Sequence, residues 1–92
     1  MSVDAVIFGI RQIRTLFLDN QWNFSREGTL DILAALDCMR EPLMKEDIAG
    51  FDQYVNAMLS RSPDMADFIL EELFDYLGIR DRDELTLILN QD

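Results

Sequence analysis

Acidic side chains come nearest, in type and spacing, to a site for chemistry in this chain. Asp81, Asp83 and Asp92 match three positions of a twelve-residue calcium loop, in which carboxylate oxygens ligate the ion. Such a loop also needs an oxygen ligand at its fifth position and a glycine at its sixth, and these positions hold Leu85 and Thr86. The sequence therefore predicts no calcium site, and we expect no other metal.

The single cysteine, Cys38, is the only thiol that could act as a nucleophile. A reactive thiolate needs a base or another group that lowers its pKa, and the chain contains no histidine. Cys38 also falls in a segment with helical apolar periodicity, which favours a buried structural thiol. Glycine-rich phosphate loops and nucleophile elbows are missing from the sequence. We therefore expect no catalytic residues, no cofactor and no enzymatic activity.

The composition indicates one folded acidic domain that spans residues 1–92. A chain of 92 residues with 49% hydrophobic and 28% charged residues can bury one modest core. Eighteen acidic residues against eight basic ones give a net charge of −10, which repels nucleic-acid phosphates and anionic membranes. We therefore expect a basic protein partner and no direct contact with nucleic acid or membrane.

Targeting signals are missing from the sequence. The apolar stretch 5–10 contains Gly9 and ends at Arg11, so it is too short and too polar for a signal peptide. The chain has no run of 18 apolar residues that could span a membrane. A lone thiol fits a reducing compartment. These features together predict a cytoplasmic protein.

Apolar residues recur at helical spacing throughout the chain and nowhere alternate as in a half-buried strand. The pattern predicts an all-α fold, a compact bundle of four to five helices. The first helix is expected from Val3 to Asn20, followed by a loop over 21–24 that holds Trp22 and Phe24. Its expected core residues, together with those of the later helices, are Ile10, Ile13, Phe17, Leu33, Leu36, Phe51, Val55, Ile69 and Leu73.

Capping residues predict the ends of the later helices. Ser25 is expected to cap the second helix, and Pro42 to end it at Glu41 because proline disfavours helical geometry in the preceding residue. The third helix then begins at Pro42 or Lys45. For the fourth helix, the cap is expected at Ser62, with a proline next to it, and a glycine at position 78 ends the helix. The acidic box at 81–84 opens a short fifth helix.

The charge is distributed unevenly along the chain. Residues 1–45 contain six acidic and five basic residues, for a net charge of −1. Residues 46–92 contain twelve acidic and three basic residues, for a net charge of −9. The fourth expected helix has no basic residue between positions 62 and 77, although like charges spaced one turn apart destabilise a helix. Either this helix has a solvated face, or it has a patch complementary to a basic partner.

One large aromatic residue lies among the acids of that helix. At about 100° per residue, the five carboxylates occupy an arc of roughly 140°, and Phe68 projects near its middle. An apolar side chain ringed by charges is typical of an interface hot spot, although a helix packed on two sides would also bury it. The predicted partner-binding residues are Asp64, Asp67, Phe68, Glu71, Glu72 and Asp75.

The first helix carries a second unusual surface. Phe8 and Leu16 fall on the side opposite its main apolar stripe, whereas Arg14 falls inside that stripe. Burying an unpaired arginine is costly, so Arg14 is expected to reach water along its apolar stem or to pair with an acid of another subunit. These three residues are the predicted contacts of a possible homodimer.

The sequence supports two classes of function. The first is an acidic inhibitory binding protein, such as an immunity protein or antitoxin that neutralises a basic nuclease-type toxin by covering its cationic surface. A phage inhibitor of a nucleic-acid-binding defence complex would use the same physics. The second is a structural or regulatory homodimerisation module, which the two-sided first helix and the five methionines favour.

Overall fold

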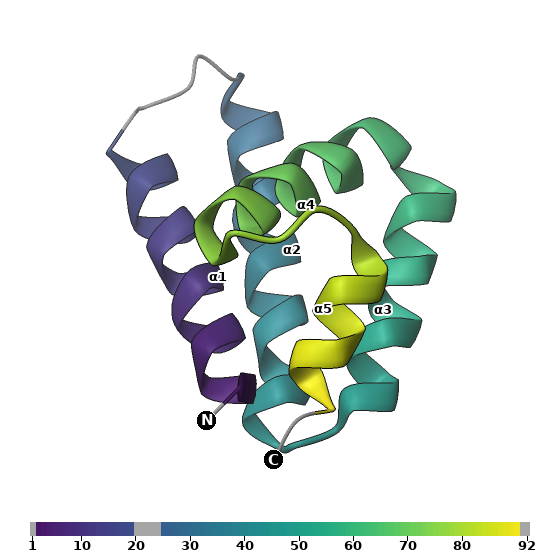
Figure 1. The fold of residues 1–92 in the computed structure, drawn as a ribbon. Helices are drawn as coiled ribbons and strands as arrows, with labels where there is room; N and C mark the ends of the chain where they lie inside the picture. Colours follow the sequence, from purple (N-terminus) through teal and green to yellow (C-terminus); the bar gives the residue numbers. More distant parts are fainter. Residues whose placement is uncertain (1, 20–24, 91–92) are drawn as a thin grey trace.

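The fold of this protein, a computed structural model, is described for residues 2–19 and 25–90. Over these residues the chain forms five helices and no strand, so the predicted all-α bundle is confirmed (Figure 1). The predicted loop with Trp22 and Phe24 lies outside the described residues. The helices are α1 (Ser2–Leu18), α2 (Arg26–Met44), α3 (Ile48–Arg61), α4 (Pro63–Leu77) and α5 (Arg82–Leu89).

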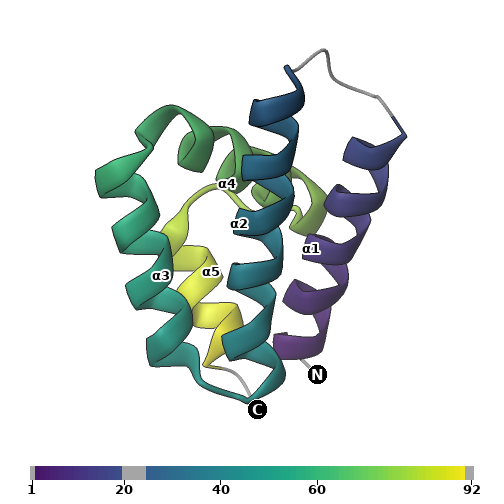
Figure 2. The ribbon, with the colours of Figure 1, turned by 180° about the vertical axis from the view of Figure 1, so that it is seen from behind.

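The helices are arranged in two layers. Helix α2 lies between α1 and α3, and these three helices form one layer, seen from its outer side in Figure 2. Helices α4 and α5 cover the opposite side of this layer, where α4 contacts α1, α2 and α3, and α5 contacts α1 (Figure 1). The outer side of the α1–α2 pair therefore faces away from α4.

Helix α2 is longer than predicted. Pro42 does not end it at Glu41 but lies inside the helix, which continues to Met44, so α3 begins neither at Pro42 nor at Lys45 but at Ile48. Interior proline costs about 3 kcal/mol in a helix. The extra turn places Leu43 in the core with 1% exposure, and burial of such a side chain contributes free energy of similar size.

The predicted caps of the other helices are present with one exception. Ser25 accepts a hydrogen bond from the Gly28 amide, and Asp81 accepts one from the Glu84 amide. Gly78 has a φ of 72°, the left-handed conformation predicted for the end of α4. Ser62 occupies the cap position of α4, but its side chain makes no capping hydrogen bond; the same residue also ends α3.

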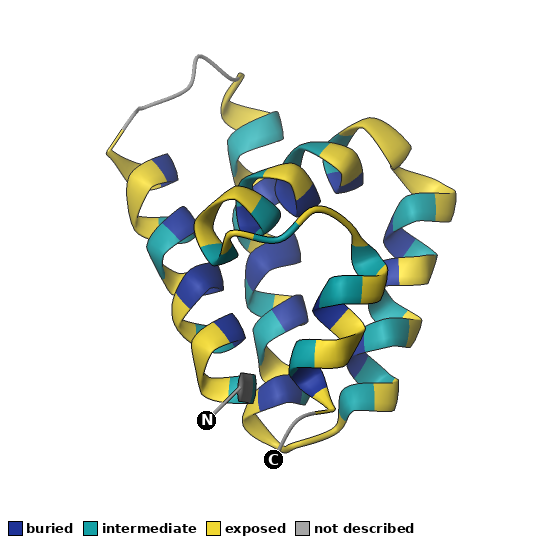
Figure 3. Ribbon diagram, viewed as in Figure 1, coloured by how far each residue is buried: buried dark blue, intermediate teal, exposed yellow. Residues whose placement is uncertain are grey.

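The core lies between the two layers, where buried positions of all five helices meet (Figure 3). Eight of the nine predicted core residues are buried, and the ninth, Leu33, is partly buried and packs against the others. The prediction of a buried Cys38 is wrong, because this thiol is exposed. Its position is about 100° around the helix from the buried Met39, which turns it away from the core stripe.

Among the described residues, no helix is long and apolar enough to cross a membrane.

Candidate functional site

The first candidate surface is the outward side of α4, which carries the predicted carboxylates. We call Asp64, Asp67, Glu71, Glu72 and Asp75 the acidic face. Four of them are exposed and Glu72 is half-buried, while Ile69 and Leu73 on the inner side of the same helix are fully buried. The helix is thus amphipathic, and packing of its apolar side on the first layer holds the carboxylates outward.

The carboxylates of the acidic face are not neutralised by ion pairs with the described residues. None of its five carboxylates forms an ion pair with another described residue, whereas the ion pairs elsewhere in this part of the chain use Asp37, Glu41, Asp52 and Glu84. The pKa of Glu72 is raised, first because burial removes water from its carboxyl group and then because Asp75 and Glu71 repel its charge. The field of these carboxylates is therefore available to a partner.

A hollow of about 470 Å³ lies at the C-terminal end of the acidic face. Its carboxylate lining consists of Glu71, Glu72 and Asp75, and its apolar lining includes the half-buried Phe74 and Ile79. Arg80 also lines the hollow, and its Nε lies 3.3 Å from Oε1 of Glu84. Carboxylates beside apolar side chains match the charged head and aliphatic stem of a lysine or arginine. The arrangement can hold one basic side chain of a partner.

Phe68 lies differently from the other predicted partner-binding residues. Its ring is partly buried and packs against the hydrophobic core. The ring is thus packed on one side rather than fully exposed, as for a helix packed on two sides, and its role as a partner contact stays a prediction. A helical wheel gives the direction of a side chain about its own axis only, and it does not show which neighbouring residues reach that side.

The three predicted dimer contacts do not share one surface. Phe8 is 51% exposed and Leu16 is 44% exposed, and the ring of Phe8 lies 6.2 Å from the ring of Tyr76 on α4. Arg14 instead pairs with α2, where its Nε lies 3.0 Å from Oδ1 of Asp37. Arg14 thus finds its carboxylate within its own chain, with part of its side chain still in water.

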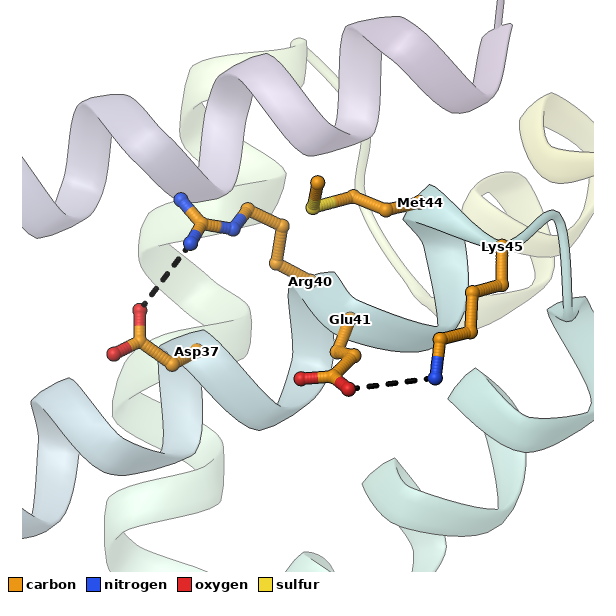
Figure 4. Close-up of a pocket in the computed structure, with 5 residues that line it drawn as sticks. All are labelled: Asp37, Arg40, Glu41, Met44 and Lys45. Atoms are coloured by element: carbon orange, nitrogen blue, oxygen red, sulfur yellow. Dashed lines mark hydrogen bonds and ion pairs between the residues drawn. The ribbon is translucent and has the colours of Figure 1, made fainter.

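A second surface, missed in the sequence, is lined by residues of α1 and α2. Two hollows of about 570 and 240 Å³ share Arg40 and Met44, and we call them together the α1–α2 groove. Figure 4 shows the residues of the larger hollow. The groove is lined by Ile7, Arg11, Asp37, Arg40, Glu41, Met44 and Lys45. The one signal for it in the sequence is that three of the eight basic residues lie at positions 11, 40 and 45.

Metal and thiol chemistry have no assembled site in the described part of the chain. No group of three or more histidine, cysteine, aspartate or glutamate side chains there could hold a metal ion. Asp92 of the rejected calcium loop lies outside the described residues. Cys38 lies near Tyr54, whose pKa is raised mainly by burial and further by the charge of this thiol and its hydrogen bond.

Comparison of the chain with known protein families, curated proteins and solved structures finds no significant match.

Proposed function

We propose that this protein is an inhibitory binding protein of the immunity-protein or antitoxin type, which covers the cationic surface of a basic nuclease-type toxin. The observation that carries the proposal is the acidic face, five carboxylates on one helix that form no ion pair with any described residue. Unpaired surface carboxylates repel one another and lower the stability of a free protein. A cationic partner would remove this repulsion and use the field for binding.

The physics of association fits an inhibitor. A nuclease binds phosphates through a cationic cleft, and carboxylates concentrated on one face steer a protein toward such a cleft. Complementary charges raise the association rate more than they raise the affinity. The hollow beside Phe74 and Ile79 would add burial of one basic side chain, which slows dissociation.

Affinity capture from the native host tests the proposal. Wild-type protein is compared with a Glu71→Lys/Asp75→Lys variant and with a control variant, Glu46→Lys, whose exposed side chain lies outside the acidic face. We expect wild type and control to capture the same basic nuclease, identified by mass spectrometry and inhibited in a cleavage assay. The double variant should no longer capture this nuclease. Equal capture by all three proteins, or no basic protein at all, contradicts the proposal.

A phage inhibitor of a defence complex would use the same surface, and the identity of the captured protein separates the two roles. Capture of a nucleic-acid-binding complex with several subunits favours the phage inhibitor. Capture of a single toxin favours the immunity protein.

Homodimerisation is the second candidate, supported by the exposed apolar rings of Phe8 and Tyr76. Exposed rings in contact provide the beginning of an apolar patch of the kind that dimers bury around a two-fold axis. Light scattering over a range of protein concentrations tests this candidate. A dimer mass that Phe8→Glu converts to a monomer mass supports it, and a monomer mass at every concentration rejects it.

A further inference from the structure

We propose that the α1–α2 groove binds one carboxylate side chain from an acidic, partly apolar segment of a partner protein. The residues that line the groove belong to α1, to α2 and to Lys45, which ends α2, and none belongs to α4. Helix α4 lies on the other side of the layer that contains α1 and α2 (Figure 2). The groove is therefore separate from the acidic face, and the two surfaces can be occupied at the same time.

The Nε–H group of Arg40 is a donor in the groove that lacks an acceptor. This nitrogen is buried and has no hydrogen-bond partner among the described residues. Nη2 of Arg40 lies 3.8 Å from Oδ1 of Asp37, which is too far for a hydrogen bond, and the same oxygen already accepts from Nε of Arg14 at 3.0 Å (Figure 4). A buried donor without an acceptor is costly. The planar fork of a guanidinium matches a carboxylate, which can accept from two N–H groups at once.

The charge of the groove favours an anion. Three cations, Arg11, Arg40 and Lys45, line it together with two carboxylates, Asp37 and Glu41, which leaves a net charge of +1. Lys45 is engaged with Glu41 at 3.4 Å, whereas Arg11 forms no ion pair with any described residue. One carboxylate balances this charge. A nucleic-acid backbone would place several phosphates near the two lining carboxylates and would be repelled.

Apolar side chains beside these cations favour a protein segment over a small free anion. Met44 is 64% exposed and Ile7 is partly buried, and both line the groove next to Arg40 and Arg11. A flexible thioether adapts to different apolar side chains at binding surfaces. We therefore assign to the partner an aspartate or glutamate flanked by an apolar residue.

Nuclear magnetic resonance on the full chain labelled with ¹⁵N tests this site. The probe is the peptide acetyl-Gly-Leu-Glu-Leu-Gly-amide, and its control is the same peptide with glutamine in place of glutamate. We expect saturable shifts of the Arg40 Nε–H signal and of the Arg11 and Met44 amides. Because glutamine lacks the charge, the affinity of the control peptide should be lower by a factor of about ten or more.

Three variants locate the interaction. Arg40→Gln and Arg11→Gln should each weaken binding of the glutamate peptide about tenfold. Arg61→Gln makes the same change of charge at a residue that lines neither hollow, and it should bind like wild type. If Arg40→Gln does not fold, the exposed Arg11→Gln still decides the question. Retention of peptide binding in both groove variants overturns the proposal.

Other occupants of the groove give distinct results. Inorganic phosphate that shifts the Arg40 signal at lower concentration than the peptide would overturn the peptide assignment in favour of a phosphate ligand. If the chemical shifts of groove residues change with protein concentration in the absence of peptide, the occupant is a second copy of this chain, and the peptide assignment is overturned. Equal shifts with the glutamate and glutamine peptides would overturn the role of the carboxylate.

Discussion

Arg14 on α1 and Asp37 on α2 join two helices of the first layer through a contact of 3.0 Å between Nε and Oδ1. The side chains are 36% and 46% exposed, so water competes with the pair. Asp37 also lies 3.8 Å from Nη2 of Arg40. One carboxylate is thus shared between two arginines. Because Asp37 cannot neutralise both of them, positive charge remains in the α1–α2 groove.

The Arg14–Asp37 pair should contribute little to stability. A double-mutant cycle with Arg14→Ala and Asp37→Ala is expected to give a coupling free energy of about 0.2 to 1 kcal/mol, because both groups remain partly in water. Urea unfolding at low and high salt measures it. Coupling should decrease as salt increases, and a coupling well above this range would show that the pair is better shielded than its exposure indicates.

Leu73 should be among the most sensitive positions of the fold. It is fully buried where α4 packs on the first layer, so Leu73→Ala is expected to lower the free energy of unfolding by about 2 to 5 kcal/mol. Leu87 is 65% exposed, and Leu87→Ala is the matched control with an expected change within about 0.5 kcal/mol. Chemical denaturation followed by circular dichroism compares them. Similar losses in both variants would contradict the placement of Leu73.

Phe68 should matter for folding. Because its ring packs against the core, Phe68→Ala is expected to lower the free energy of unfolding by about 1 to 3 kcal/mol. Phe8→Ala, which removes a ring that is 51% exposed, serves as the control with a smaller loss. Thermal unfolding of both variants gives the comparison. An unchanged melting temperature for Phe68→Ala would show that the ring contributes little to the core, and it would favour a role as an exposed partner contact.

Glu72 should make stability depend on pH in a direction opposite to that of most carboxyl groups. Its folded pKa is raised, so the folded state holds this proton more tightly than the unfolded state does. Its destabilising effect is therefore present at neutral pH and is relieved as pH falls through the raised pKa toward the ordinary value near 4.5. Glu72→Gln should stabilise the protein at pH 7 and reduce this gain on acidification.

Unfolding measured from pH 7 to pH 4 checks the Glu72 prediction. Glu46→Gln, at an exposed position outside the acidic face, is the control and should retain the wild-type pH profile. A Glu72→Gln profile parallel to that of wild type would assign the pH dependence to other groups.

Charge reversal on the acidic face should separate binding from folding. Once a basic partner is in hand, Glu71→Lys is expected to slow association and to weaken its dependence on salt, because a steering carboxylate is replaced by a repelling cation. Stability should stay equal or rise, since repulsion by Glu72 and Asp75 is relieved. Stopped-flow kinetics and thermal unfolding measure the two effects. Unchanged association kinetics would show that the acidic face is only a solvated surface.

The end of α2 shows the limit of local signals. Proline is a strong local signal against helix, and by this signal α2 ends at Glu41. The observed helix continues through Pro42 because Leu43 lies in the core, which depends on helices α1, α3 and α4 and is invisible in the local sequence. The same reasoning applies to Phe68, whose position on its own helix does not show that it packs against the core.

The sequence by itself determined the all-α class, most of the core and the concentration of carboxylates on α4, because helical periodicity and charge are properties of single segments. Only the tertiary structure decided that Arg14 pairs with Asp37, that Phe8 meets Tyr76 and that the Nε of Arg40 is buried without an acceptor among the described residues. These contacts join residues of different helices. Their geometry depends on how the helices pack in three dimensions, which no single segment encodes.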